Sequence, residues 1–157
     1  MKMLMLKFNC LKCGNHFNAH ELGVDSYGVF ILRSAGTASE AYLDAMQDST
    51  YQEVNGLLKL HARWRELKPN ELADVLRKSY GLIACDPDQA GQPFQIGMFP
   101  KCPSCGSQEM ASWEATDPPV FIEMEISPVT HMSWSSLSDA EKTTKVAQAL
   151  KQLGYLQ

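Results

Sequence analysis

Several short runs of apolar residues predict strands in the first and last parts of the chain. They cover residues 3–8, 27–32, 94–99, 108–115 and 120–126, and the run at 27–32 is rich in aromatic and β-branched side chains. The last run alternates regularly, with Phe121, Glu123 and Glu125 on one face and apolar residues on the other. Such alternation is typical of a half-buried strand with one acidic, solvent-facing side. We expect these strands to form one small sheet.

Apolar residues that recur at three- and four-residue steps between these strands predict helices. A first helix, capped by Thr37 or Ser39, is expected to end near Lys68, where a proline follows. A second helix is expected to start at the cap Asn70 and to stop at Gly81. The insertion between the strands is therefore expected to be mainly helical.

A last helix is predicted by the capping-box pattern of Ser138 and Glu141, and we expect its apolar stripe to pack on the sheet. The whole pattern predicts an α+β fold, in which a small antiparallel sheet is split by a helical insertion and covered by the C-terminal helix. A length of 157 residues and a hydrophobic content of 45% fit one compact domain. The expected parts of this single domain, residues 1–157, are the sheet (1–33 and 94–126), the helical insertion (37–81) and the C-terminal helix (138–153).

Two copies of a Cys-x-x-Cys-Gly motif carry the most specific chemistry in the sequence. The first contains Cys10 and Cys13, and the second contains Cys102 and Cys105. Two intervening residues let both sulfurs of a motif face one point, and the glycine permits a tight turn with positive φ. Four thiolates from two such turns satisfy the tetrahedral coordination of one zinc ion. Because a catalytic zinc normally keeps one position open, a full set of four thiolates favours a structural site.

Both motifs resemble the knuckles of zinc-ribbon, or rubredoxin-like, proteins, with Phe8 and Phe99 shortly before the first cysteine of each. The resemblance implies a ribbon-type sheet locked by one structural Zn²⁺ ion. It covers about the first twenty residues and residues 94–115, and 88 residues separate Cys13 from Cys102, whereas simple ribbons use roughly 15 to 20. Closing the longer loop costs about 1.4 kcal/mol more, far less than the roughly 10–16 kcal/mol that zinc contributes. The long insertion therefore does not exclude the metal site.

Iron in the same ligands, redox-active pairs and disulfides are the alternatives for these cysteines. Disulfides need an oxidising compartment, but residues 1–8 are too short and too weakly apolar for a signal peptide. No stretch reaches the roughly 18 apolar residues of a transmembrane helix, so we expect a reduced, cytoplasmic protein without a membrane partner. The fifth cysteine, Cys85, lies in an apolar run and is expected to be a small buried residue.

The chain contains no nucleotide-binding glycine loop, no zincin motif and no nucleophile elbow. The net charge is −4, and from residue 106 onward acidic side chains outnumber basic ones by seven to three. We therefore expect a noncatalytic, zinc-stabilised module that binds a protein partner, itself basic in the simplest case, as an adaptor, regulator or inhibitor.

A nucleic-acid-binding regulator is the second hypothesis. The locally basic region contains Lys59, Arg63, Arg65 and Lys68, with Trp64 among them, and such a surface would place cations on phosphate and an aromatic ring on a base. The resemblance to zinc ribbons adds to this hypothesis, since many of them serve that role. Against it, Trp64 falls on the apolar stripe of its predicted helix and is expected to lie in the core.

Overall fold

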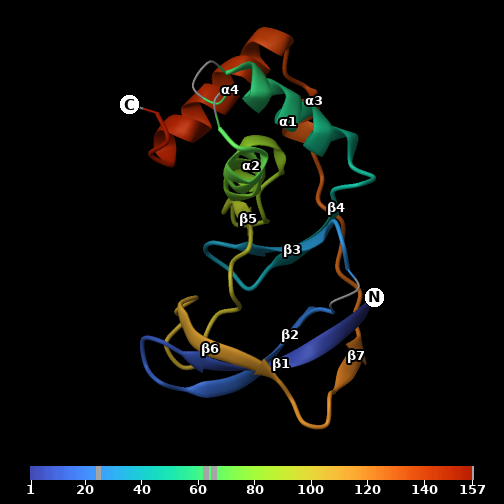
Figure 1. The fold of residues 1–157 in the computed structure, drawn as a ribbon, viewed down its shortest axis with the longest axis vertical. Helices are drawn as coiled ribbons and strands as arrows, with labels where there is room; N and C mark the ends of the chain where they lie inside the picture. Colours follow the sequence, from blue (N-terminus) through green and yellow to red (C-terminus); the bar gives the residue numbers. More distant parts are fainter. Residues whose placement is uncertain (24–25, 62–63, 65–66, 157) are drawn as a thin grey trace.

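A computed structural model describes residues 1–23, 26–61, 64 and 67–156. Two antiparallel sheets and a layer of helices follow one another along the longest axis of the molecule (Figure 1). The elements are β1 (Lys2–Cys10), β2 (His16–Leu22), β3 (Val29–Ser34), β4 (Glu40–Asp44), α1 (Ser49–Leu60), α2 (Pro69–Ala84), β5 (Phe94–Ile96), β6 (Met110–Ala115), β7 (Phe121–Glu123), α3 (Met132–Ser135) and α4 (Asp139–Gln152). The predicted α+β class with small antiparallel sheets is confirmed.

The first sheet contains β1, β2, β6 and β7 and joins the two ends of the sequence. β1 is its central strand, because β2 pairs with it along nearly its whole length. β6 pairs with the second half of β1 and β7 with the first half, so these two short strands follow one another along the other side of β1. The first sheet therefore brings the segment after residue 100 next to the segment before residue 11.

The second sheet has the order β4-β3-β5. The predicted strands at 27–32 and 94–99 thus exist as β3 and β5, but the expectation that they belong to the sheet of the cysteine motifs is wrong. Successive residues of β3 point to opposite faces. Leu32 belongs to the helical core, whereas Val29 and Ile31 face the first sheet. A strand that is apolar on both faces can lie between two layers, which explains its position.

The beginning of the first predicted helix is also corrected. Residues 40–44 form β4, in which the buried Ala41 and Leu43 alternate with half-buried neighbours. The helix α1 starts only at Ser49, because the Asp48 side chain accepts hydrogen bonds from the N–H groups of Thr50 and Tyr51. The apolar positions at 41, 43 and 45 thus fit the period of two of a strand. Because this strand has only five residues, its period could not be told from the helical pattern that follows it.

The helix α2 continues through Gly81 to Ala84, so the predicted stop at this glycine is wrong. A Cβ atom at Gly81 would overlap the carbonyl oxygen of Phe94. The glycine therefore serves close packing of α2 against β5 rather than helix termination.

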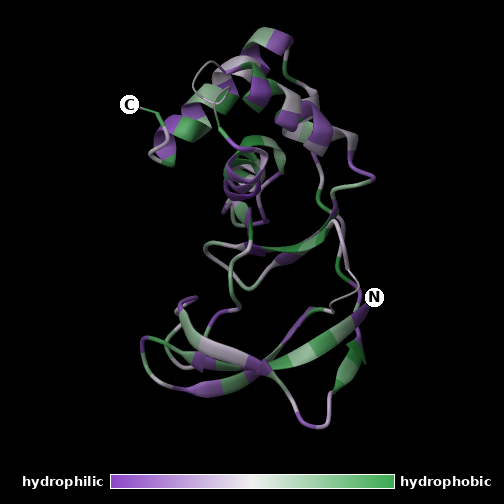
Figure 2. Ribbon diagram, in the orientation of Figure 1, coloured by the Kyte–Doolittle hydropathy of each residue, from purple (hydrophilic) through white to green (hydrophobic). Residues whose placement is uncertain are grey.

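The capping box of the last helix is present: Ser138 accepts from the Glu141 N–H, and the Glu141 carboxylate accepts from the Ser138 N–H. Val146 and Leu150 of α4 are buried in the core that α1 and α2 also form. The main packing of α4 is thus with these two helices. Figure 2 shows hydrophobic stretches in β1, β3 and β7 as well as in the helices.

The described residues form two separate hydrophobic clusters. The larger one, here called the helical core, contains buried residues of the second sheet and of α1, α2, α3 and α4. The smaller one, here called the cysteine cluster, has Phe8, Cys10, Cys102 and Met110 as its buried members. The small size of the cysteine cluster means that apolar burial alone stabilises the first sheet weakly.

Candidate metal centre

The four cysteines of the two motifs converge at one end of the first sheet. Cys10 is the last residue of β1, and its Sγ lies 3.6 Å from that of Cys105. The Sγ atoms of Cys13 and Cys102 are also 3.6 Å apart, and all four sulfurs lie within 4.8 Å of one another. A tetrahedral ion with metal–sulfur bonds of about 2.3 Å places its ligands about 3.8 Å apart, whereas a disulfide requires about 2.05 Å. The arrangement therefore fits one metal ion and does not fit disulfides.

The two turns that carry the cysteines have the same backbone conformation. The Cys10 carbonyl accepts from the Gly14 N–H at 3.0 Å, and the Cys102 carbonyl accepts from the Gly106 N–H at 2.8 Å. Each of these cysteines also donates its own N–H to the carbonyl five residues on, at 2.9 and 2.8 Å. Both glycines have a φ of 76°, a value that favours glycine. The sequence repeat thus corresponds to a structural repeat.

Backbone N–H groups in each turn stabilise thiolate over thiol at the first cysteine. The N–H of Cys13, followed by smaller contributions, lowers the pKa of Cys10. Burial acts to raise the pKa of Cys102, but the N–H groups of Cys105 and Ser104 outweigh it and lower the pKa to about 6. These two sulfurs are therefore prepared to act as anionic metal ligands.

The second cysteine of the first turn has the opposite tendency. An N–H from Asn15 acts to lower the pKa of Cys13, but burial and the neighbouring sulfurs raise it to about 12. Four thiolates this close repel one another, so they can all ionise together only around a cation. A divalent ion bound at the centre would supply the missing charge.

Aromatic rings surround the site on its buried side. The ring of Phe8 stacks on Phe17 at 5.6 Å and meets Phe99 edge-on at 6.2 Å. Cys10 and Cys102 lie on this side and are buried, whereas Cys13 and Cys105 are exposed. Four cysteine ligands would leave a tetrahedral ion no open coordination position, as is typical of structural rather than catalytic metal centres.

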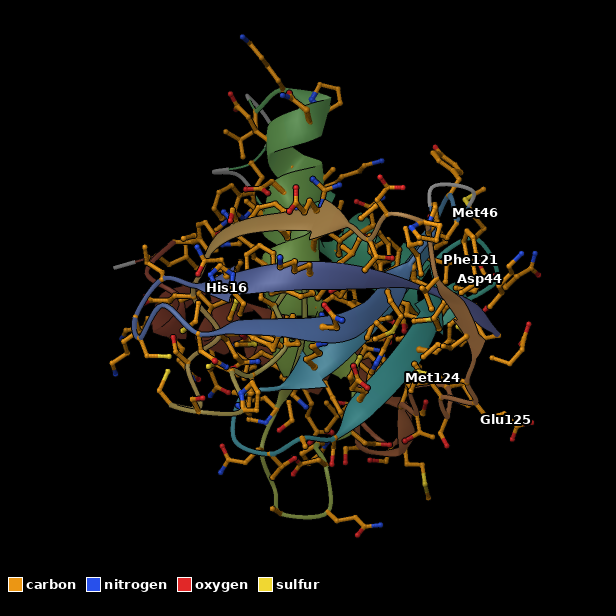
Figure 3. The ribbon with its side chains drawn as sticks, turned by 90° about the horizontal axis from the view of Figure 1, so that it is seen from below. His16, Asp44, Met46, Phe121, Met124 and Glu125 are labelled. Carbon is orange, nitrogen blue, oxygen red and sulfur yellow. The ribbon has the colours of Figure 1, made fainter. Side chains whose placement is uncertain are left out.

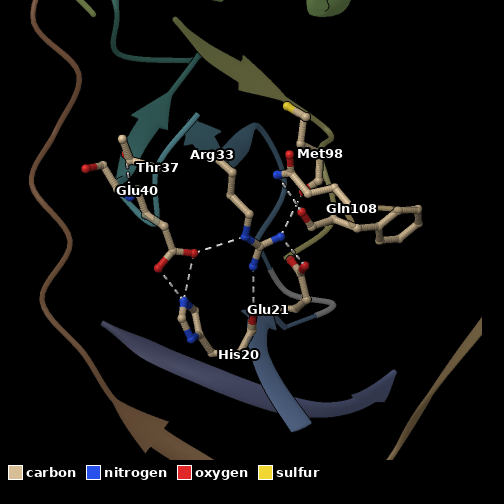
Figure 4. Close-up of polar contacts among 9 residues, drawn as sticks. His20, Glu21, Arg33, Thr37, Glu40, Met98 and Gln108 are labelled. Carbon is tan, nitrogen blue, oxygen red and sulfur yellow. Dashed lines mark hydrogen bonds and ion pairs between the residues drawn. The ribbon is translucent and has the colours of Figure 1, made fainter. Parts of the chain in front are cut away.

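A buried arginine connects the sheet of the cysteines to the second sheet (Figure 4). Arg33 of β3, 5% exposed, donates to the Glu21 and Glu40 carboxylates and to the carbonyls of Met98 and His20. His20 also contacts the Glu40 carboxylate at 2.7 Å. Burial acts to raise the pKa of Glu40, but His20 and Arg33 outweigh it and lower the pKa. This network was not predicted from the sequence, although a single cation directly after the apolar run 27–32 was a usable signal.

A second buried polar cluster joins three helices. The Nε2 of His131 lies 2.7 Å from the Asp48 carboxylate, and its Nδ1 lies 2.7 Å from the carbonyl oxygen of Ala84. The hydroxyl of Tyr80 lies within 3.3 Å of both side chains, and burial raises the pKa of this tyrosine. Cys85 next to this cluster is buried, as predicted, and its pKa is raised to about 12 by burial. The cluster thus connects the starts of α1 and α3 to the end of α2.

The basic residues of the nucleic-acid hypothesis are only partly described. Lys59 near the end of α1 and Lys68 before α2 are exposed, whereas Arg63 and Arg65 lie outside the described residues. Trp64 is 6% exposed and meets the Tyr155 ring edge-on at 5.8 Å, which confirms its predicted place in the core. This ring is therefore not presented to a nucleobase.

Within the described parts of the chain, no helix combines the length and the apolar character that crossing a membrane requires. Comparison of the chain with models of protein families, with curated proteins and with solved structures finds no match.

Proposed function

We propose that the four cysteines hold one structural zinc ion and that the protein is a zinc-stabilised, noncatalytic module that binds another protein. The closed set of four convergent sulfurs carries the first half of this proposal. In such a site zinc supplies no catalytic position; it neutralises the thiolates and ties Cys10 and Cys13 to Cys102 and Cys105.

Zinc is favoured over iron because the site's only evident task is structural, and zinc has no redox chemistry of its own. The repeated turn with a glycine after each second cysteine supports a zinc-ribbon-type knuckle pair. Five free cysteines also fit a reducing compartment such as the cytoplasm. Iron in the same ligands remains the alternative that elemental analysis distinguishes.

The second half of the proposal depends on a group of exposed apolar side chains, here called the apolar surface: Tyr27, Met46 and Phe121. Tyr27 is 89%, Met46 65% and Phe121 52% exposed. The side chain of Met46 lies against Gly28, next to Tyr27, and Phe121 lines a cavity together with Ser26 and Val29. Large exposed apolar groups gathered in this way are typical of protein interaction sites.

Acidic groups accompany the apolar surface. Figure 3 shows Asp44, Met46, Phe121 and Glu125 on one side of the molecule, away from His16. Glu123 and Glu125 are exposed on the same face of the β7 segment as Phe121. Glu123 pairs with the Met1 ammonium at 3.2 Å and Lys2 lies 4.5 Å from the centre of the Phe121 ring, so Asp44 and Glu125 carry the acidic character of this surface. A partner that offers apolar side chains flanked by lysine or arginine would match this combination.

The zinc half of the proposal is tested by elemental analysis of protein purified without added metal, with cysteine titration before and after chelation. One zinc per chain and four protected thiols support it. A metal-free protein whose four thiols react at once would contradict it. One iron per chain would show that the site binds iron instead of zinc.

The binding half is tested by placing a photoreactive amino acid at Phe121 and identifying cross-linked proteins in cells. A control protein carries the same group at Met132, which is also exposed but lies on α3. Specific cross-links from position 121 that Glu125→Lys weakens support the proposal. The same proteins captured from both positions, or none from position 121, would contradict it.

A further inference from the structure

A cavity of about 520 Å³ lies between the two sheets. Its walls come from strands of both sheets and from the segment that follows β5, and they are mainly apolar. Typical wall residues are Leu6, Ile31, Ile96, Met98 and Trp113. Cavities that bind small molecules in proteins usually measure about 300–1,000 Å³ and combine apolar walls with a few polar groups. This cavity has both properties.

Arg33 forms one polar part of the wall, but its charge is already balanced. Its side chain is more than nine-tenths buried and bonds Glu21, Glu40 and two backbone carbonyls. Glu21 is the acidic residue of the cavity wall, and it belongs to this network. The network therefore holds the two sheets at a fixed separation on this side of the cavity and leaves little charge for a ligand.

Arg77 of α2 is the other cation of the cavity wall, and its charge is much less satisfied. Its guanidinium lies 3.9 Å from Asp74, at the limit of an ion pair, and its side chain is 45% exposed. The Asp74 carboxylate is closer to Lys78, at 2.9 Å. The cavity thus combines an apolar interior with a guanidinium group at its margin that can bind an anion.

We propose that this cavity binds a small amphipathic monoanion, whose apolar body lies between the sheets and whose carboxylate or sulfonate group pairs with Arg77. The positive charge of Arg77 favours a negatively charged ligand, and the apolar side chains of the wall favour a ligand with an apolar body. This ligand site is additional to the proposed protein-binding role and does not depend on it, since Arg77 and the apolar surface around Phe121 are different groups.

The first experiment uses 8-anilinonaphthalene-1-sulfonate, an aromatic monoanion that fluoresces in apolar surroundings, and the metal-loaded full chain. Trp113 lines the cavity and is 51% exposed, so a bound probe should quench it by energy transfer. Decanoate should displace the probe, and decanol, which lacks the charge, should displace it more weakly. Displacement by both compounds with equal affinity would refute the anion specificity, and no binding would refute the site.

Two variants of α2 test the role of the guanidinium. Arg77→Ala should weaken decanoate binding by about three- to tenfold, as expected for a partly exposed charge-assisted contact, and should leave decanol binding unchanged. Lys78→Ala is the matched control, because Lys78 is exposed on the same helix and does not belong to the described cavity wall. An equal loss in both variants would show a general effect of net charge and overturn the assignment.

A variant that fills the cavity tests the position of the apolar body. Ile96→Phe adds a ring to the wall, at a half-buried residue of β5 that lies outside the cysteine cluster and does not line the cavity of Phe121. With unchanged circular dichroism and thiol protection, this variant should bind neither probe nor decanoate. Retained binding in the folded variant would place the ligand elsewhere. Should Ile96→Phe not fold, Ile31→Phe on the adjacent strand β3 replaces it under the same criteria.

Discussion

Replacement of Cys102 by serine should disorder the first sheet and leave the helical core folded. Cys102 is a buried member of the cysteine cluster, and the helical core contains none of the four convergent cysteines. Burial of the other large members, Phe8 and Met110, stabilises the first sheet by about 3–6 kcal/mol in total, at about 1.5–3 kcal/mol for each side chain. A structural zinc site contributes roughly 10–16 kcal/mol in small domains. The proposed metal would therefore stabilise this sheet more than the burial of these two side chains does.

Hydrogen exchange resolved along the sequence is the assay, because it reports each layer separately. In the Cys102→Ser variant the amides of β1 and β6 should lose protection, and those of α2 and α4 should keep most of theirs. Trp113 lies in β6 and Trp134 in the helical core, so the fluorescence of each, isolated by replacing the other two tryptophans with phenylalanine, reports the same division. Cys85→Ala is the control, since Cys85 is buried in the helical core and should leave metal content and exchange of the first sheet unchanged.

Two results would refute this reasoning. Protection of β1 that stays at the parental level in a variant proven to lack metal would show that the metal does not hold the sheet. Loss of protection in α2 and α4 together with β1 would show that the two clusters unfold as one unit.

Three further changes give testable outcomes. Gly81→Ala should destabilise the protein by several kcal/mol, because its Cβ would overlap the Phe94 carbonyl. Gly56 on α1 has open space around it, so Gly56→Ala should be neutral or stabilise the protein by up to about 1 kcal/mol. Urea unfolding measures both changes in stability. Arg33→Met should cost about 3 kcal/mol in the same assay, the lower end for breaking a buried ion pair, since it removes the guanidinium partner of the partly buried Glu21 and Glu40 carboxylates. Burial acts to raise the pKa of Asp86, but hydrogen bonds, including those from the first N–H groups of α3, lower it from 3.8 to about 2. Its contribution should therefore be complete above pH 3.8 and disappear as the pH falls through 2, and Asp86→Asn should flatten this part of the stability profile.

The two cysteine turns were predictable because their information is local. Each motif places two sulfurs and a glycine within five residues, and the structure repeats the same turn twice. The last helix was predictable for the same reason, since Ser138 and Glu141 form its start within four residues. In both cases a short segment determines its own conformation.

The parts that were predicted wrongly depend on contacts far apart in the sequence. Gly81 has the features of a helix stop until Phe94, thirteen residues later, packs against it. β3 has a clear strand pattern, but its neighbours depend on pairing with two segments, one of them about sixty residues away. The Arg33 network combines partners 7, 12, 13 and 65 residues apart. No local pattern encodes such distances, so propensity and periodicity cannot supply them.

The distance of 89 residues between Cys13 and Cys102 has a consequence during synthesis. A ribosome that adds about 5–20 residues per second needs roughly 4–18 seconds between these two cysteines. Over this interval the first pair of thiols exists without the second, open to oxidants and to transient metal capture. β6, β7 and α4 emerge later still, so the last third of the chain completes both the first sheet and the helical core. A nascent chain arrested before residue 102 would therefore contain only Cys10 and Cys13 of the four cysteines. Its helices α1 and α2 would still lack α4, which packs against them in the helical core.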